Sequence, residues 1–305
     1  MRAGFILPQI GPLGTAQNLV KVAQRAEELG YDSLWVTERL LWPVKPQNPY
    51  PATPDGSLPE QYKHSLDPLE TLTFVAAHTR KIALGTSVLD IPYYNPVMLA
   101  RRTTTLDVLS GGRLRLGLGL GWSKDEYQAA GAPAKNHGAV AEEFLQVLKA
   151  IWTTDPAEFQ GQFYTLPKSI IGPKPVQKPH PPIYMAAFAP AALNRLARLA
   201  DGWNPVGMPL EAMAATMAQI RQMAKDAGRN PASLQLIVRA NLYVTPQPIT
   251  QNRFVFTGTL EQIKEDVEGC RRIHADEIFF DCIFSPAGNS MDRFLGLMQQ
   301  MRAFV

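Results

Sequence analysis

The stretch LGTSVLDIPYYNPVMLARRTTTLDVLSGGRLRLGLGLGW, residues 84–122, decides the fold. It connects two apolar runs, 82–89 and 113–120, through a helical pattern over 96–109 that ends at Ser110-Gly111-Gly112. Both runs are continuously apolar rather than alternating, which is typical of parallel strands covered on both faces. The stretch therefore predicts two parallel strands joined by a helix.

The same alternation of short strands and helices continues through the chain. Further strands are predicted at 4–7, 33–37, 183–187, 202–206, 234–244 and 277–282, and helices at 16–29, 67–79, 124–127, 139–152, 190–199, 210–227, 259–273 and 291–302. Eight strand–helix units in 305 residues predict a single α/β domain over 1–305, a (β/α)8 TIM barrel. A doubly wound open sheet is the competitor, but the turn at 8–14 lacks the G-x-G-x-x-G spacing of a dinucleotide site.

Two proline-rich segments, approximately 39–64 and 155–182, interrupt this pattern and are predicted to be insertions at the C-terminal rim of the barrel. The functional residues of such a barrel follow the carboxyl ends of its strands. The residues at those ends are therefore the candidates for a site.

Composition excludes several classes of function. The formal charge is +3 with no run of Lys or Arg, which gives no support for a nucleic-acid partner. Cys270 and Cys282 have no metal-like spacing, so neither a metal site nor a disulfide framework is predicted. No apolar run reaches the roughly 18 residues of a membrane span, and Pro8 breaks the N-terminal run too early for a secretory signal. A cytoplasmic protein without a membrane partner is expected.

Several segments of the chain resemble a known family. The chain is similar to the luciferase-like flavin-dependent oxidoreductases, and within them to the branch that uses the deazaflavin coenzyme F420 as well as FMN. The resemblance is collinear over almost the whole chain and rests on the segments 26–38, 82–122, 172–187, 192–205 and 256–270. It implies the same (β/α)8 fold and a flat isoalloxazine-type ring at the barrel mouth.

The resemblance also implies the residues that hold this ring. Relatives have a non-proline cis peptide bond after the third strand, which corresponds to Ser87–Val88. Asp90 follows it and would face the edge of the ring or cap a turn. At the end of the fourth strand, Gly119 and Gly121 would clear space for the cofactor, or would only allow tight packing. Trp122 would line the cofactor tail or pack against the next helix.

The segment Ala187-Phe188-Ala189 would receive the cofactor phosphate through backbone N–H groups at a helix N-terminus. Many relatives have a Gly-Gly pair here, which this chain lacks. Arg239 lies inside an apolar strand, where a buried guanidinium needs a partner. It could point toward the ring or pair with Glu38 or Asp281.

Glu38 and Arg39 are the catalytic candidates. Many relatives that use F420 have Asp-His or a similar pair at this place, and this chain has no histidine there. Glu38 could act as an acid–base group or could orient Arg39, and Arg39 could hold an anionic cofactor tail or substrate. A structural ion pair at the rim is the alternative. His64 and His137 lie in rim segments and are the only histidines that could replace the missing one.

The implied activity is hydride transfer between F420 and a small organic substrate, with a homodimer as the expected assembly. The alternative is an FMN-dependent luciferase-like monooxygenase, because nothing in the sequence identifies the ring atom that separates a flavin from a deazaflavin. A catalytically silent barrel is the second alternative, suggested by the missing histidine and the missing Gly-Gly pair.

Overall fold

The computed structural model describes residues 1–133 and 135–305. Its main sheet closes on itself through the pairing of β3 with β5. The barrel strands, all parallel, are β1 (Arg2–Ile6), β2 (Ser33–Val36), β3 (Ala83–Thr86), β5 (Leu114–Gly119), β8 (Ile183–Met185), β9 (Gly202–Trp203), β10 (Gln235–Asn241) and β13 (Glu277–Asp281). The (β/α)8 barrel predicted from the sequence is confirmed.

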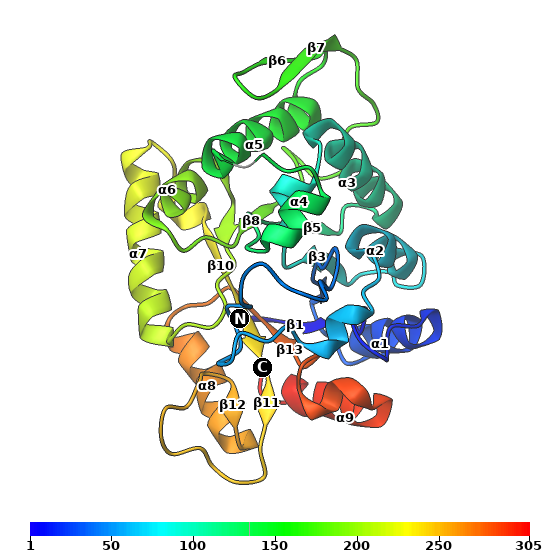
Figure 1. Cartoon of the computed structure of the whole chain (residues 1–305), viewed down its shortest axis with the longest axis vertical. Helices are drawn as coiled ribbons and strands as arrows, with labels where there is room; N and C mark the ends of the chain where they lie inside the picture. The colour runs from blue at the N-terminus through cyan, green and yellow to red at the C-terminus, as the bar shows by residue number, and fades with distance from the viewer. Residues whose placement is uncertain (134) are drawn as a thin grey trace.

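The helices surround the strands in chain order, except α4, which lies inside this ring in Figure 1. They are α1 (Ala16–Glu28), α2 (Pro68–Ala76), α3 (Pro96–Ser110), α4 (Lys124–Ala129), α5 (His137–Thr153), α6 (Pro190–Leu199), α7 (Leu210–Asp226), α8 (Leu260–Arg272) and α9 (Met291–Arg302). Among the residues described, none of these helices is long and apolar enough to cross a membrane.

Helix α3, at the centre of the opening stretch, has clear local reasons to form. The Asn95 side chain accepts hydrogen bonds from the N–H groups of Val97 and Met98, and Pro96 occupies the first helical position. At the other end Gly111 has a φ of 72°, a left-handed conformation that favours glycine. These signals fix both ends of the helix that carries the chain from β3 to β5.

Trp35 fills the interior of the barrel. Its ring is fully buried and stacks on Phe279 with centroids 4.7 Å apart. Gly4 and Gly85 make this possible, because a Cβ at either position would overlap the indole. The large side chain and the two glycines therefore form one packing unit.

The amino ends of the strands are closed by a buried ion cluster around Glu277. Its carboxylate accepts hydrogen bonds from Ser33 and from the indole Nε1 of Trp35, and it pairs with Arg115 and with Arg2 at 3.3 Å. A buried carboxylate is tolerated when it is paired and hydrogen-bonded in this way. This end of the barrel is thus filled by protein side chains.

The segment 39–64 lies where it was predicted, at the carboxyl ends of the strands. It leaves β2 and reaches the chain after β5, where Asn48 bonds the carbonyl of Trp122 at 3.2 Å and Gln47 bonds Asp125. Its regular element is the short 3-10 helix η1 (Glu60–Lys63). The segment therefore joins two sides of the mouth.

The segment 155–182 differs from the prediction. It forms the hairpin β6 (Ala157–Gln160) and β7 (Thr165–Ser169), which packs on α5 at the periphery in Figure 1. It then enters β8 from its amino end, with the Gln177 side chain donating to the carbonyl of Leu114 at the start of β5. The reason is topological, because a connection from a helix to the next strand runs to the opposite end of the barrel from the mouth.

Smaller strand pairs complete the structure. β4 (Leu89–Asp90) adds to β5 beyond the end of β3, and β11 (Tyr243–Val244) pairs with β12 (Thr257–Gly258). The predicted strand 234–244 is therefore split in two, and the predicted strand 202–206 is only two residues long.

Candidate functional site

The residues predicted from the ends of the strands do lie together on the carboxyl side of the barrel, but they are not equally accessible. Ser87, Asp90, Gly119 and Ala187 are buried. Val88, Gly121 and Trp122 are partly exposed, and Phe188 and Ala189 are exposed. A ligand at the mouth therefore has direct access only to the partly exposed and the exposed residues.

The bulge after β3 is held from two sides. The Ser87–Val88 peptide bond is cis, as the resemblance implied. The Ser87 hydroxyl donates to Asn204 Oδ1 at 2.6 Å, and Arg239 donates to the Ser87 carbonyl at 3.0 Å. Arg239 itself pairs with Asp281 at 2.6 Å, so Asp281 rather than Glu38 is its carboxylate partner. The bulge is thereby fixed with Val88 partly open to solvent.

Gly119 and Gly121 leave room for the chain's own side chains. A Cβ at Gly119 would lie 2.6 Å from Val88 Cγ2. A Cβ at Gly121 would lie 2.9 Å from Asp90 Oδ2, and the φ of +72° at this residue already favours glycine. Both glycines thus meet the packing requirement of the bulge, whether or not a ligand lies beyond it.

Glu38 connects the end of β2 to the chain after the bulge. Its carboxylate accepts hydrogen bonds from the backbone N–H of Asp90 at 2.6 Å and from the Tyr94 hydroxyl. Burial, with the nearby charge of Asp90, raises the pKa of Glu38 from 4.5 to about 8. Burial and the charge of Glu126 also raise the pKa of Asp90, to about 7, against the opposing effect of Arg39. Two carboxyl groups with raised pKa values therefore interact at this point of the rim.

Arg39 points away from Glu38 and pairs with Glu126 of α4 at 2.5 Å. Its guanidinium lies 5.0 Å from the ring centre of Tyr62 and 5.1 Å from that of Trp122, which are cation–π distances. The prediction that Glu38 could orient Arg39 is therefore wrong. The structural ion pair that the sequence left open as an alternative exists, with Glu126 as its acid.

Glu126 is the residue of this region that sequence reasoning missed. It is fully buried and also accepts hydrogen bonds from the N–H groups of Leu40 and Leu41 and from the Tyr93 hydroxyl. In the sequence it is one acidic residue in the first turn of a short helix, where a solvated side chain is the normal expectation. No local signal distinguishes it.

The two candidate histidines make separate contacts at the rim. His64 is exposed and follows η1, where its carbonyl accepts from the N–H of Gly11. His137 begins α5, and its Nε2 lies 2.5 Å from the Pro133 carbonyl. His64 also lines a cavity with Gln9, and the centre of the His137 ring lies 4.7 Å from that of Tyr127, so both stay candidates.

Helix α6 begins beside the barrel mouth without a side-chain cap. Ala189 is its N-cap residue, and a methyl group cannot accept a hydrogen bond from the first turn. Ala187 is fixed by the indole Nε1 of Trp203, which donates to its carbonyl at 2.9 Å. The positive end of the helix is therefore open to an anion.

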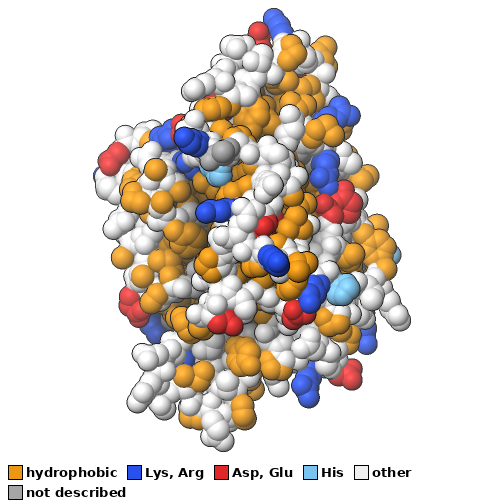
Figure 2. Space-filling view, in the orientation of Figure 1, with side chains coloured by type: hydrophobic (Ala, Val, Ile, Leu, Met, Phe, Trp, Pro, Cys, Tyr) orange, Lys and Arg blue, Asp and Glu red, His pale blue; other side chains and the backbone are white. Residues whose placement is uncertain are grey.

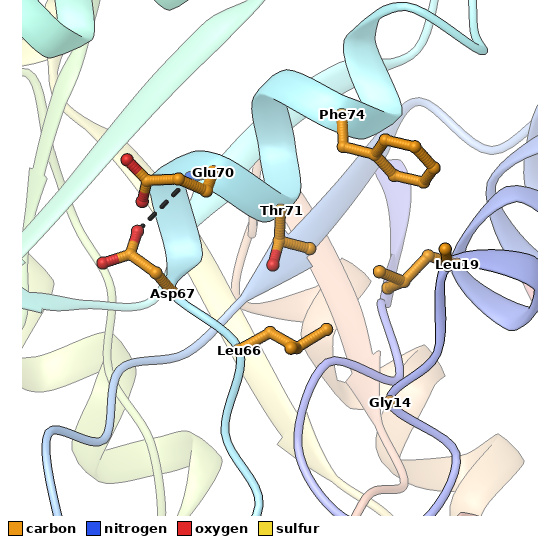
Figure 3. Close-up of a pocket in the computed structure, with 8 residues that line it drawn as sticks. Gly14, Leu19, Leu66, Asp67, Glu70, Thr71 and Phe74 are labelled. Atoms are coloured by element: carbon orange, nitrogen blue, oxygen red, sulfur yellow. Dashed lines mark hydrogen bonds between the residues drawn. The ribbon is translucent and has the colours of Figure 1, made fainter.

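Two cavities border this side of the molecule. Figure 3 shows the first, a groove of about 310 Å³ between α1 and α2, with Leu19, Leu66 and Phe74 around it and Asp67 and Glu70 at one side. It is lined by none of the predicted site residues. The second, of about 300 Å³, is lined by Gln9, Gly11, Gly14, Lys63, His64, Ser65 and Leu66.

The residues at the mouth fit a flavin or deazaflavin. Gln9 and Thr37 follow the neighbouring strands β1 and β2, and the Gln9 Oε1 and Thr37 Oγ1 atoms are buried without a hydrogen-bond partner among the residues described. Unpaired buried polar atoms are costly, and the polar edge of such a ring can satisfy them. The open start of α6 suits the phosphate that both cofactors carry.

Charges over the face in Figure 2 are mixed, with Lys and Arg in small groups separated by acidic and apolar side chains. Among residues 1–133 and 135–305, no three His, Cys, Asp or Glu side chains are grouped as metal ligands.

Comparison with known proteins adds three relatives. An uncharacterised protein of Mycobacterium tuberculosis is 38% identical over 183 residues, 59% of this chain and 64% of the relative. An FMNH2-dependent dimethylsulfone monooxygenase of Pseudomonas putida is 34% identical over 155 residues, 50% of this chain and 42% of that protein. An F420-dependent glucose-6-phosphate dehydrogenase of Amycolatopsis mediterranei is 32% identical over 199 residues, 64% of this chain and 54% of that protein.

The matched regions thus span less than two thirds of the length of these relatives. The family match is much longer. The profile described as luciferase-like monooxygenase covers residues 3–269, which includes every barrel strand except β13. On that match the chain belongs to the luciferase-like monooxygenase family.

Proposed function

We propose that the protein is a coenzyme F420-dependent oxidoreductase that transfers a hydride between the deazaflavin and a small organic substrate. The observation that carries the proposal is the uncapped start of α6 beside the partly exposed Val88 bulge, which offers an anion site and an apolar wall at one mouth. The relative named as F420-dependent matches 64% of this chain and the one named as FMNH2-dependent 50%, which supports F420 as the first choice.

Bound F420 would supply a hydride donor or acceptor, and the protein would supply position and electrostatics. In this proposal Val88 supports the ring, Ser87 and Asp90 hold the bulge in place, and Gly119, Gly121 and Trp122 form the adjoining wall. The N–H groups around Ala187, Phe188 and Ala189 receive the phosphate.

Glu38 is proposed to hold the proton that balances hydride transfer, because its raised pKa keeps the carboxyl protonated at neutral pH. Arg39 is proposed as a positioning residue. Its ion pair with Glu126 and its two aromatic contacts fix the start of segment 39–64 over the mouth.

An FMN-dependent monooxygenase is the second candidate, favoured by the relative named as an FMNH2-dependent dimethylsulfone monooxygenase. A catalytically silent cofactor-binding barrel is the third, favoured by the position of Arg39, which occupies the place of a catalytic histidine and is engaged by Glu126.

Fluorescence titration with purified F420 and FMN distinguishes these candidates. We expect one F420 to bind per chain at micromolar concentration, and binding of FMN alone would overturn the choice of cofactor. Turnover of F420 with a panel of small alcohols and enones, followed by absorbance, separates the enzyme from the silent barrel. Binding without turnover of any substrate favours the latter.

A homodimer in the cytoplasm is part of the proposal. Helices α2 and α3 expose Phe74, Met98 and Leu109, with Leu109 at 64% exposure, and a partner subunit packed on these helices would cover such side chains. Light scattering coupled to gel filtration should give twice the chain mass, and Leu109→Lys should shift it toward the monomer.

A further inference from the structure

Arg195 is a buried cation whose hydrogen bonding is incomplete within the part of the chain that the structure describes. It lies on α6, is 4% exposed, and belongs to the buried face of that helix with Leu193 and Leu196. Its Nε and Nη1 atoms are buried, and neither has a hydrogen-bond partner among the residues described. A guanidinium stays charged, so an uncompensated one in this position costs free energy unless something pairs with it.

Glu142, the carboxylate whose charge acts on Arg195, already has another partner. Glu142 of α5 receives both terminal nitrogens of Arg198, at 2.7 and 2.8 Å, and the Arg198 Nε bonds Asn194 at 2.9 Å. Arg198 is therefore fully paired one helical turn below Arg195. The two arginines and one glutamate leave one positive charge unbalanced.

The guanidinium of Arg195 is directed at the start of α5. Its Nη2 lies 2.8 Å from the point where a Cβ on Gly138 would be, in the first turn of that helix. α5 has 17 residues, and its N-cap Asn136 makes no side-chain cap bond. Within the described residues, the first turn has no side-chain cap, and the positive end of its helix dipole lies beside a cation. An anion bound here would offset both positive charges.

We propose that Arg195 and the first turn of α5 form a binding site for an oxyanion, a phosphate or carboxylate group. Both α5 and α6 follow barrel strands, β5 and β8, that are neighbours in the sheet. The site therefore lies at the same rim as the start of α6. One source of the anion rests on the proposed function, namely the acidic chain of F420 or the phosphate of FMN. A free phosphate or an acidic substrate is the other.

Arg195→Met tests the site, because it removes the charge and keeps an unbranched side chain. Four probes are titrated by fluorescence: F420, its phosphate-free deazaflavin riboside, FMN and riboflavin. F420 and its riboside form one pair of ligands, and FMN and riboflavin the other. In the pair that binds, we expect Arg195→Met to lower the affinity for the phosphate-bearing ligand by about tenfold or more. Affinity for the phosphate-free partner should not change. Equal loss for both partners would mean a structural role only and would overturn the proposal.

Inorganic phosphate provides an arm that does not depend on the cofactor. Melting temperatures are measured in phosphate and in chloride at equal ionic strength for the natural chain, Arg195→Met and the control Arg101→Met, which removes an exposed charge on α3. We expect phosphate to raise the melting temperature of the natural chain and of the control, but not of Arg195→Met. An equal rise in all three would contradict the site.

The two arms separate the proposals. If no variant binds any ring, the proposed function fails, while phosphate stabilisation through Arg195 alone would still support the anion site. If the ring binds with an affinity independent of Arg195 but phosphate acts through it, a free anion or acidic substrate is the occupant.

Discussion

Arg39 and Glu126 are 87 positions apart in the sequence, yet their side chains form an ion pair of 2.5 Å in the interior of the rim. The pair joins the chain after β2 to α4. Breaking a buried pair from one side leaves an unpaired charge, which costs about 3–5 kcal/mol. We expect Arg39→Met and Glu126→Gln each to lower the free energy of unfolding by about that amount, and the double variant to lose less than the sum. Urea denaturation of all four proteins measures the coupling, and strictly additive losses would rule it out.

The pKa of Glu38 predicts a pH dependence of stability. Because it is raised from 4.5 to about 8, the folded protein holds this proton over a range where the unfolded chain has lost it. The stabilising contribution is fully present below about pH 4.5 and is lost as the pH rises through about 8. Glu38→Gln should therefore flatten the decline of the free energy of unfolding between pH 5 and 8. Glu60→Gln, at an exposed residue, is the control and should leave the decline as it is.

Gly121 and Gly228 form a matched pair for the wall beside the bulge. Both have left-handed backbones, with φ of +72° and +74°, but an added Cβ meets Asp90 at the first and nothing within 4 Å at the second. We expect Gly228→Ala to cost about 1 kcal/mol through the backbone alone. Gly121→Ala should cost more and weaken cofactor binding, because it displaces the Asp90 carboxylate. Equal costs and unchanged binding would remove Gly121 from the proposed site.

Ala189 allows the start of α6 to be tested by addition. Asp or Asn at this N-cap should stabilise the helix by about 1 kcal/mol, since either side chain can accept from the first turn. Only Asp adds a negative charge. Ala189→Asp should therefore lower cofactor affinity more than Ala189→Asn, while both melt at a higher temperature than the natural chain. An identical affinity for the two variants would argue against phosphate at α6.

The sequence predicts what is local. The ends of α3 follow from Asn95, Pro96 and Gly111, and the parallel strands follow from continuous apolar runs, so the barrel could be predicted without a structure. The partners of buried charges could not. Glu126 is buried because a segment more than 80 positions away in the chain donates to it, and Arg195 is isolated because Arg198 takes Glu142. Such competition depends on side-chain geometry, which residue spacing does not encode.

The position of segment 155–182 shows the same limit of prediction from composition. Its prolines and lysines suggest a loop, but composition does not say which end of the barrel a loop serves. The order of elements does, since the segment precedes a strand instead of following one. The order of the predicted elements was therefore a better predictor of the segment's position than its composition.

The packing of Trp35 on Phe279 above the Glu277 cluster has a kinetic consequence. Because side chains fill the amino end of the barrel, ligands reach it only from the mouth. Two reactants that bind there must therefore enter and leave through the same opening. We therefore expect an ordered mechanism, in which the reactant that sits deeper binds first and departs last. Product-inhibition patterns would reveal that order. Segment 39–64, which spans the mouth, would set the rate at which reactants bind and leave.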